Sequence, residues 1–558
     1  VLEIGCGDGF GGAMVAGVDP LRLASGVFRG GQARVDTGNT KIIFHRDGKT
    51  ATITVTESRG GVRALLTNGK SDGATHPGPG PATSDDHTMV LLGALGPLHH
   101  PQAKTAAVIG LGTGTSSAVL LESPAIERLD TIEIEPVVVD AAQLFRPRNA
   151  KVFDDPRSRI VVDDARAYFS KTGARYDIVV SEPSNPWVSG VAGLFTVEFY
   201  SHVAAHLAPG GHFVQWLHLY EASPELVASI VHAFSKVFPE FAAYASTDTN
   251  IVLVARNDGK PPQLDTAALD QMPGLRARLM ELGITSGAVL AAHDAGRASA
   301  IQLLAYSYGT PPNSDYQPYV DQRAAGDRFR NASAHGLFAL REAPIPQLDF
   351  AGGGPPWASQ VHDATHWMPS QVRNQASSWH GHRLLTGQEL SPQEASYLGA
   401  YVRDYALVRA WSQACNFPRS TAGAWTAMLN VANDLNPGLD SATAAAWWQS
   451  VIGGRCQAAF SPVQKTWLAL FAAVGGRRAA AAHGPAEWLL QNDPDLDAEG
   501  RSYATLAAVS ANLALDRRVE AAAVLKAQRA RLPASVLDSP PFRYATMALT
   551  AMKKPAPP

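Results

Sequence analysis

Three glycines follow a short apolar run in the first half of the chain. The run AAVI (106–109) is typical of a buried strand, and Gly110, Gly112 and Gly114 come directly after it, ahead of a helix-like segment. Glycines permit a tight turn and a close approach of the backbone, while the N–H groups at the start of the following helix suit a polar ligand. A coincidental glycine turn has the same spacing, so the weight of this motif depends on what the neighbouring strands carry.

Acidic residues follow the next three strand-like runs. The run TIEIE ends in Glu133 and Glu135, which strand alternation places on one face, about 20 residues after the glycines, where an acid suits a ribose diol. Asp163 and Asp164 follow RIVV, beside the expected adenine edge, and Glu182 follows YDIVVS at the crevice where such sheets bind ligands. Solvated strand ends or helix caps would explain one such acid, but four suitable strand ends in succession favour a nucleoside site.

The segments around these residues indicate the elements that position them. From 105 to about 256, short β-rich runs alternate with helix-period segments, which is typical of a parallel, doubly wound sheet. Residues 41–66 form alternating runs separated by turn signals at 46–48 and 59–61, which predict a small antiparallel sheet. The stretch THPGPGPAT (75–83) predicts an irregular loop or lid.

A chain of 558 residues is too long for a single core. We predict the α/β class, with a Rossmann-like (class I methyltransferase-type) doubly wound sheet, a small antiparallel β segment before it and an α-helical domain after it. Proline and glycine mark a linker at 344–357, and beyond it tryptophans at helical spacing predict core packing between helices. The predicted divisions are an irregular leader (1–37), a β-hairpin segment with a loop (38–100), the Rossmann-like domain (101–345) and a helical-hairpin array (346–558).

Composition excludes several classes of protein. A net charge of -3 and a pI near 6.7 give no electrostatic footprint for nucleic acid. The three cysteines (Cys6, Cys415 and Cys456) lie far apart, so a disulfide scaffold is not expected and a reducing, cytoplasmic compartment is the default. His362 and His366 have i, i+4 spacing without a glutamate after the first histidine, so we expect no metal. No run is apolar enough to span a bilayer, although the chain begins at Val1 and a membrane segment upstream of it is possible.

The order of the motifs adds a resemblance to a known family. In sequence come NGKSD (68–72), GLGTG (110–114), EIE (133–135), DDA (163–165) and YDIVVSEPSNPW followed by GLF, FY and PGGHFVQWLHL. This order resembles the polyamine aminopropyltransferases, the spermidine synthase family, over about 40–265. The forms GLGTG and SEPSNPWV resemble the bacterial branch in which the domain is often fused to membrane segments.

The resemblance implies an activity and roles for individual residues. It implies transfer of an aminopropyl group from decarboxylated S-adenosylmethionine to a small-molecule amine, with release of 5′-methylthioadenosine by a homodimeric enzyme without a metal. Glu182 would be the general base that deprotonates the attacking amine, because an alkylammonium with a pKa of about 10.4 is not a nucleophile. The expected nucleoside-binding residues are Gly110, Gly112, Thr113, Gly114, Glu133, Asp163, Asp164 and Asp72, and the expected acceptor-binding residues are Asn185, His87 and Trp216.

The chain departs from the family pattern at two carboxylates. Thr113 stands where the family has an acid after the second glycine, and Asn185 replaces the second acid of D-x-x-D-P. The acceptor loop after the last motif is shortened to 245–250. An acid at position 113 would repel the carboxylate of intact S-adenosylmethionine, so its loss weakens the preference for the decarboxylated donor. The residues that could compensate are Asp72, Asp85, Asp86, Glu221 and Asp315.

Two alternatives therefore stay open. One is a methyltransferase or another transferase that uses S-adenosylmethionine itself. The other is a catalytically silent nucleoside-binding module whose helical domain binds a partner, a reading that the retained Glu182 disfavours.

Overall fold

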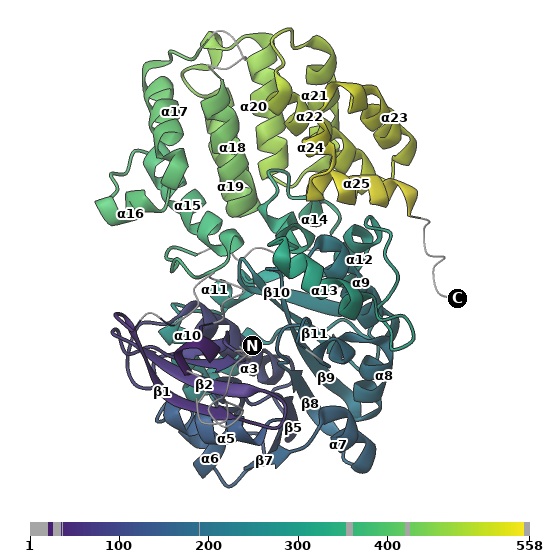
Figure 1. Ribbon diagram of the computed structural model, residues 1–558. Helices are drawn as coiled ribbons and strands as arrows, with labels where there is room; N and C mark the ends of the chain where they lie inside the picture. Colours follow the sequence, from purple (N-terminus) through teal and green to yellow (C-terminus); the bar gives the residue numbers. More distant parts are fainter. Residues whose placement is uncertain are drawn as a thin grey trace, which may run out of the picture.

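Three structural parts follow one another along the chain (Figure 1). The computed structural model describes residues 20–25, 35, 37–188, 190–352, 361–418 and 425–551. A small sheet and a large mixed sheet lie next to each other at one end of the molecule, and the helices of the C-terminal part form the other end. Apart from helix α1 (Pro20–Leu23) and a few neighbouring residues, the predicted leader lies outside the described residues, and so does Cys6.

The small sheet is antiparallel, as the turn signals predicted. Its strands follow the order β1-β2-β3-β4. Asn68 and Gly69, with φ of 50° and 78°, form the tight turn between the last two strands, which is the Asn-Gly geometry of a two-residue hairpin. Of the motif NGKSD (68–72), only the first two residues form the turn, because Lys70 already begins a strand and Asp72 lies within it. The strands are β1 (Thr40–Asp47), β2 (Thr52–Ser58), β3 (Arg63–Thr67) and β4 (Lys70–Thr75).

A long buried helix, α3 (Ser84–His99), follows the irregular loop that the prolines and glycines predicted. Thr83 and Asp86 form a capping box at its start. The segment was assigned to the β-hairpin part of the chain, and that assignment missed the helix because its residues are apolar on all sides. Such a helix is buried all round, and α3 packs against strands of both sheets.

The large sheet has eight strands in the order β12-β10-β11-β9-β8-β5-β6-β7. Five of them are parallel, and their order from the β7 edge is third, second, first, fourth and fifth along the chain, which confirms the doubly wound class. The hairpin of β10 and β11 and the short β12 extend the other edge with antiparallel pairing. The strands are β5 (Thr105–Ile109), β6 (Arg128–Glu133), β7 (Ser158–Val162), β8 (Tyr176–Ser181), β9 (Leu207–His218), β10 (Phe241–Thr247), β11 (Asn250–Arg256) and β12 (Asp294–Arg297).

Alternate residues of these strands enter two separate cores. Ala107 and Phe213 face a core shared with the helices on one side of the sheet, whereas Val108 and Val214 face α3 and α4 on the other side. This double coverage explains why the strands read as nearly continuous apolar runs. The helices of this part are α4 (Thr115–Leu120), α5 (Pro136–Ala142), η1 (Gln143–Phe145), α6 (Ala150–Asp154), α7 (Ala165–Lys171), η2 (Val191–Phe195), α8 (Val197–Ala205), α9 (Pro224–Val237), η3 (Thr266–Gln271), α10 (Pro273–Glu281), α11 (Gly287–Ala291), α12 (Ala298–Tyr306), α13 (Tyr319–Phe329) and η4 (His335–Glu342).

The segment predicted to be a linker at 344–357 is in part a packed element. Residues Gln347–Phe350 form helix α14, and Gln347 donates hydrogen bonds to Ser510 Oγ and to the carbonyl of Pro541 at 3.1 and 3.2 Å. Proline and glycine suggested an exposed connection, but Gln347 and Leu348 are buried between the two parts that the segment joins. Residues 353–360 lie outside the described part of the chain.

The C-terminal part consists of helices that pack successively against one another. Its core contains Trp447, Trp448 and Trp467, as the helical spacing predicted, whereas Trp488 is 38% exposed. The helices are α15 (Ser370–Leu385), α16 (Pro392–Ser396), η5 (Gly399–Tyr401), α17 (Val402–Ala414), α18 (Thr426–Gly438), α19 (Ser441–Gly453), η6 (Gln457–Ala459), α20 (Pro462–Gly475), α21 (Ala479–Asn492), α22 (Ala498–Ala514), α23 (Arg518–Gln528), η7 (Arg529–Arg531), α24 (Ala534–Leu537) and α25 (Pro540–Thr550).

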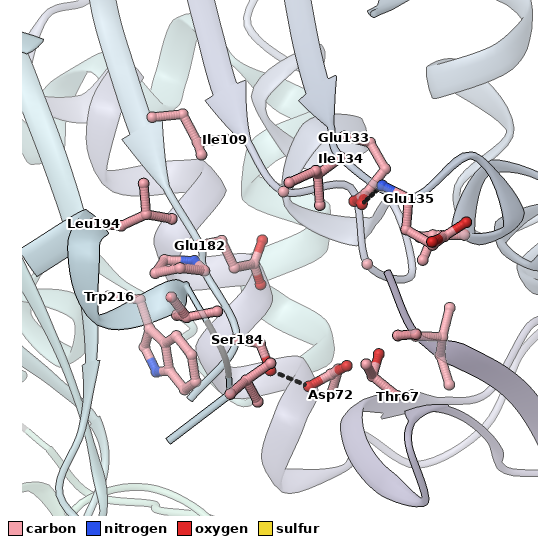
Figure 2. A pocket seen from close by; sticks show the side chains of 18 of the residues that line it. Thr67, Asp72, Ile109, Glu133, Ile134, Glu135, Glu182, Ser184, Leu194 and Trp216 are labelled. Atoms are coloured by element: carbon pink, nitrogen blue, oxygen red, sulfur yellow. Dashed lines mark hydrogen bonds between the residues drawn. The ribbon is translucent and has the colours of Figure 1, made fainter. Parts of the chain in front are cut away.

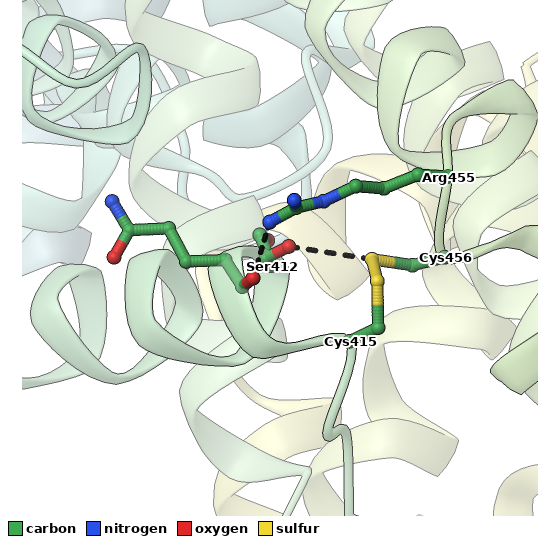
Figure 3. The surroundings of a disulfide bond; sticks show 5 residues. Ser412, Cys415, Arg455 and Cys456 are labelled. Carbon is green, nitrogen blue, oxygen red and sulfur yellow. Dashed lines mark hydrogen bonds between the residues drawn. A yellow bond between two sulfur atoms is a disulfide. The ribbon is translucent and has the colours of Figure 1, made fainter.

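A disulfide joins two of the cysteines, although their wide separation in sequence led us to expect no disulfide scaffold. Cys415 ends α17 and Cys456 precedes η6, and the two are bonded across 41 residues of sequence (Figure 3). Sequence separation misled the prediction, because helix packing brings the ends of distant segments together. Within the part of the chain that the structure describes, every helix is too short or too polar to cross a lipid bilayer.

Candidate nucleoside and amine site

The glycine turn after β5 is tied to the ends of both neighbouring strands. Gly110, Gly112 and Gly114 have φ of 94°, 50° and 80°, a backbone region that residues other than glycine rarely adopt. A Cβ atom at Gly110 would lie 2.5 Å from the carbonyl oxygen of Glu182. The turn and the end of β8 therefore approach closely only because position 110 is glycine.

Glu133 connects the end of β6 to the same turn. Its carboxylate accepts hydrogen bonds from the backbone N–H groups of Leu111 and Glu135, each at 2.9 Å. Burial raises the pKa of Glu133. These contacts fix the carboxylate where the turn meets the strand end.

Glu135 has a different role from the one that strand alternation suggested. Strand β6 ends at Glu133, so the alternation does not continue, and Glu135 caps α5 by accepting from the N–H of Val137 at 3.1 Å. Its other oxygen accepts from the backbone N–H and the hydroxyl of Thr50 at 2.7 and 2.8 Å. Glu135 thereby joins the large sheet to the small one.

The two aspartates after β7 lie at the same edge of the sheet. Asp164 caps α7 by accepting from the N–H of Ala167 at 2.9 Å, and Asp163 pairs with Lys171 at 2.9 Å. The hydrogen bond from Lys171 lowers the pKa of Asp163. Both aspartates line the cavity described below.

Glu182 is half-buried at the carboxyl end of β8. Its pKa is raised to about 7: loss of hydration raises it most, the Ser116 hydroxyl lowers it, and the neighbouring carboxylates Asp85 and Asp72 raise it. Asp85 lies on α3 and accepts from the N–H of Ala74 at 2.8 Å, and burial raises its pKa as well. Carboxylates on two other elements, α3 and β4, thus act on Glu182.

Asp72 links the small sheet to the loop after β8. One of its oxygens, Oδ1, accepts from Lys70 Nζ and from the hydroxyl of Ser184, both at 2.8 Å (Figure 2). Lys70 is only 5% exposed, so this pair is largely removed from water. The contact with Ser184 crosses from one sheet to the other.

These side chains surround a single cavity of about 370 Å³. Glu182 projects into it from between two chemically different ends: Leu194 and Trp216 lie on one side, and Glu133, Glu135 and Asp72 lie on the other (Figure 2). Of the sequence-predicted residues, the structure brings nine to the cavity lining, namely Asp72, Gly110, Gly112, Thr113, Glu133, Asp163, Asp164, Glu182 and Trp216.

Three predicted residues do not line the cavity. Gly114 packs against Asn149, where a Cβ atom would meet the amide nitrogen at 3.2 Å. His87 is buried on α3 but points elsewhere, toward Thr365, because helix periodicity turns Asp85, Thr88 and Met89 to the cavity instead. Asn185 is buried behind the cavity and donates to the hydroxyl of Tyr220 at 3.3 Å.

Of the five acids that could compensate for the missing family carboxylates, some line the cavity and others do not. Asp72 and Asp85 line the cavity. Asp86 forms a buried pair with Arg148 at 3.0 Å, and Asp315 pairs with Arg166 at 2.7 Å. Glu221 is buried outside the lining.

Sequence reasoning missed the residues that reach the cavity from outside the strand-end motifs. Tyr220 and Asn250 come from the segment after β9 and from the β10–β11 hairpin, and Thr88 and Met89 come from α3. A signal for α3 was present, since Thr83 and Asp86 match the threonine–acid spacing of a capping box.

The lining is strongly acidic. Seven carboxylate residues contribute to it, and its two cationic residues, Lys70 and Arg166, are each paired with an aspartate, at 2.8 and 2.7 Å. Such a cavity favours a positively charged ligand over an anion. The seven are Asp72, Asp85, Glu133, Glu135, Asp163, Asp164 and Glu182.

Together, the doubly wound sheet and the polar groups at four successive strand ends define a Rossmann-like domain with a candidate ligand site at its strand ends. Comparison with known proteins identifies the family. Residues 88–250 match the model of the spermine/spermidine synthase domain. The chain therefore carries a domain of the spermine/spermidine synthase family, as its motifs predicted.

Relatives of two activities match this domain. Putrescine N-methyltransferase 2 of Nicotiana attenuata is 33% identical over 153 residues, which are 26% of this chain and 40% of that protein. The polyamine aminopropyltransferase of Bacillus subtilis (strain 168) is 28% identical over 147 residues, 26% of this chain and 53% of that protein. The chain thus spans about half or less of the length of these relatives. The solved spermidine synthase from Thermotoga maritima is 20% identical, with a TM-score of 0.35, over 42% of this chain and 78% of that one.

Proposed function

We propose that this chain transfers the aminopropyl group of decarboxylated S-adenosylmethionine to an amine and releases 5′-methylthioadenosine. One observation carries the proposal: Glu182, half-buried and with a pKa of about 7, shares one cavity with Glu133 and Asp164. A proton acceptor and the groups that suit a nucleoside therefore line the same cavity.

The nucleoside would lie along the strand ends. Glu133 would accept from the ribose hydroxyls and Asp164, beside Asp163, from the adenine amine. Gly110 and Gly112, which have no side chain, leave room for the sulfonium and its substituents; around Gly112 no atom lies within 4 Å of the position that a Cβ would take.

Glu182 would act as the general base. The lone pair of the amine forms the new N–C bond, the C–S bond breaks toward sulfur, and the amine proton passes to the Glu182 carboxylate. An alkylammonium has a pKa of about 10.4 in water. The low-dielectric site lowers the pKa of the ammonium and raises the pKa of the carboxyl group. Burial therefore reduces the pKa difference that opposes proton transfer.

The charge of the lining favours the decarboxylated donor. Intact S-adenosylmethionine carries a carboxylate, and both cationic lining residues already have aspartate partners. The decarboxylated donor ends in an ammonium, which Asp72 and Asp85 can receive. These two aspartates would replace the acid that the family has at the position of Thr113.

Methyl transfer from S-adenosylmethionine is the second candidate. Thr113 removes a carboxylate that would repel the donor's own, and putrescine N-methyltransferases are among the relatives. The two activities differ in the product that leaves, which is S-adenosylhomocysteine after methyl transfer and 5′-methylthioadenosine after aminopropyl transfer.

The test incubates the purified chain with each nucleoside and a panel of amines, and it measures both products. We expect 5′-methylthioadenosine. Glu182→Gln should abolish turnover and leave nucleoside affinity within a few-fold, whereas Glu127→Gln, an exposed residue paired with Lys104, should change neither. Release of S-adenosylhomocysteine alone would establish the second candidate. Homodimerisation stays a prediction from the resemblance, and a cytoplasmic location stays a prediction from the cysteine content.

A further inference from the structure

The cavity is asymmetric in charge along the chain. Among the described residues from 183 to 250 that line it, none carries a carboxylate, whereas all seven acidic residues of the lining lie at or before position 182. The later segment contributes an apolar wall, defined as Val188, Val191, Leu194 and Trp216, together with polar groups on Tyr220 and Asn250.

The apolar wall is a built surface. Val191 and Leu194 lie three residues apart on the 3-10 helix η2, whose geometry places such side chains one above the other. The N–H of Val191 donates to the carbonyl of Val188 at 3.1 Å, which fixes the loop before the helix. Trp216 is held from β9 by a hydrogen bond from its Nε1 to Asn250 Oδ1 at 3.0 Å.

Two ammonium groups of the substrates already have carboxylate partners on the acidic side of the cavity. Under the proposed function, the terminal ammonium of the donor lies near Asp72 and Asp85, and the attacking amine lies at Glu182. The second ammonium of a diamine would add to these two and to the donor's sulfonium, and beyond Glu182 it would reach Leu194 and Trp216 (Figure 2). A cation without a carboxylate partner in such surroundings is strongly disfavoured, whereas a hydrocarbon there is favoured.

We infer that the acceptor is a primary amine with an apolar body, an alkylamine or arylalkylamine, rather than a diamine or polyamine. This inference rests on the proposed function, because it assigns Asp72 and Asp85 to the donor. Asn185 supports the inference, since an amide stands there in place of the acid of the family pattern. This amide donates a hydrogen bond to the hydroxyl of Tyr220.

The test uses acceptors matched in size. Pentylamine and 1,4-diaminobutane have the same number of heavy atoms and differ in a methyl group against an ammonium. We expect kcat/KM for pentylamine, measured by release of 5′-methylthioadenosine or S-adenosylhomocysteine, to exceed that for 1,4-diaminobutane at least tenfold. Equal values, or a preference for the diamine, would overturn the inference and would mean that the rings of Trp216 and Tyr220 accept the ammonium.

A second measurement separates this inference from the proposed function. Calorimetric titration of both amines into the chain saturated with 5′-methylthioadenosine measures affinity without turnover. If no amine reacts with either nucleoside, the proposed function fails, yet tighter binding of pentylamine would still support an apolar acceptor site. Weaker or equal binding of pentylamine would overturn it.

A pair of variants tests the wall itself. Leu194 is only half-buried, so a polar residue is tolerable there. Leu194→Asp supplies the missing carboxylate and should raise the ratio of diamine to monoamine activity or affinity at least tenfold over that of Leu194→Asn, which matches it in shape without the charge. Unchanged affinity for 5′-methylthioadenosine shows that both variants are folded. An equal ratio in the two variants would contradict the assignment of this wall to the acceptor.

Discussion

At the scale of single residues, the site depends on a carboxyl group whose proton affinity is set by burial. Partial loss of hydration is the main cause that raises the pKa of Glu182 to about 7, well above that of an exposed glutamate. The same burial that makes it a stronger base also opposes its charged form in the folded chain. Two pH dependences follow, one for catalysis and one for stability.

The catalytic dependence has a rising acidic limb. Glu182 must be deprotonated to accept a proton, so kcat/KM should increase with pH up to about 7 and level off above it. The profile is measured by product release between pH 5 and 9. A limb centred near 4.5 would show that the base is a solvated carboxylate and would exclude Glu182.

The stability dependence has the opposite direction. The folded chain binds the Glu182 proton more tightly than the unfolded chain does. The resulting contribution to the free energy of unfolding is therefore fully present below about pH 4.5, and it decreases by roughly 3 kcal/mol as the pH rises to about 7. In urea unfolding, Glu182→Gln should remove this part of the decrease between pH 5 and 8. Asp434, whose pKa burial also raises to about 7, accounts for a second part, which Asp434→Asn should remove. Parallel curves for wild type and Glu182→Gln would contradict the shift.

Gly110 and Gly112 provide a matched pair of substitutions, because both have positive φ but only one is crowded. Gly110→Ala brings a Cβ within 2.5 Å of the Glu182 carbonyl and should lower stability by about 3 kcal/mol. Gly112→Ala meets no atom within 4 Å, so it should lower stability by about 1 kcal/mol and reduce nucleoside affinity at least tenfold, since its methyl group enters the cavity. Thermal unfolding and calorimetry measure the two effects. Equal losses of stability would contradict the close approach at Gly110.

At the scale of elements, the β10–β11 hairpin couples the cavity to the helical part. Asp248 in the turn of the hairpin accepts from the N–H and hydroxyl of Ser370 at 2.6 and 2.8 Å and from Arg373 at 2.9 Å, both on α15. The guanidinium of Arg373 lowers the pKa of Asp248 against the effect of burial. Two residues further on, Asn250 lines the cavity and holds Trp216.

Loosening this anchor should affect the acceptor and spare the nucleoside. We expect Arg373→Gln to raise KM for the amine several-fold, because Asn250 and Trp216 lose their fixed position, and to leave nucleoside affinity unchanged. Arg383→Gln, which removes a pair with Glu394 inside the helical part, is the matched control. Steady-state kinetics with each substrate varied in turn check the result, and a rise in nucleoside KM alone would contradict the coupling.

The elements also show how far the sequence predicts this molecule. Strands that precede Gly110, Asp163 and Glu182 were predicted because buried parallel strands are apolar throughout and the acids mark where they end. Helix α3 was missed because an apolar helix has no amphipathic period to detect. Pairings such as Asp72 with Ser184, 112 residues apart, depend on how the two sheets pack, and no local pattern encodes that.

At the scale of the whole molecule, a buried ion network joins the large sheet to the helical part. Asp349 on α14 accepts from Arg341 at 2.8 Å and pairs with Arg477, after α20, at 3.3 Å, while Arg341 also pairs with Asp294 of β12 at 3.1 Å. Burial lowers the pKa of Arg477, which Asp349 opposes. The network makes one unit of parts that the sequence suggested were joined by a linker.

Removing its central carboxylate should separate these parts. Asp349→Asn leaves two buried guanidinium groups without their shared partner, so we expect a loss of about 3 kcal/mol and a second thermal transition. Asp154→Asn, which breaks an exposed pair with Arg146, should leave the unfolding transition unshifted. Differential scanning calorimetry measures both. A single unshifted transition in Asp349→Asn would contradict the role of the network.

The ion pair between Arg373 and Asp248 joins residues that lie 125 positions apart in the sequence, and this has a consequence for synthesis on the ribosome. At about 5 to 20 residues per second, the guanidinium emerges roughly 6 to 25 seconds after the hairpin that it secures. A nascent chain that already contains Gly110, Glu133 and Glu182 must therefore wait for α15 before the last wall of its cavity is locked in place.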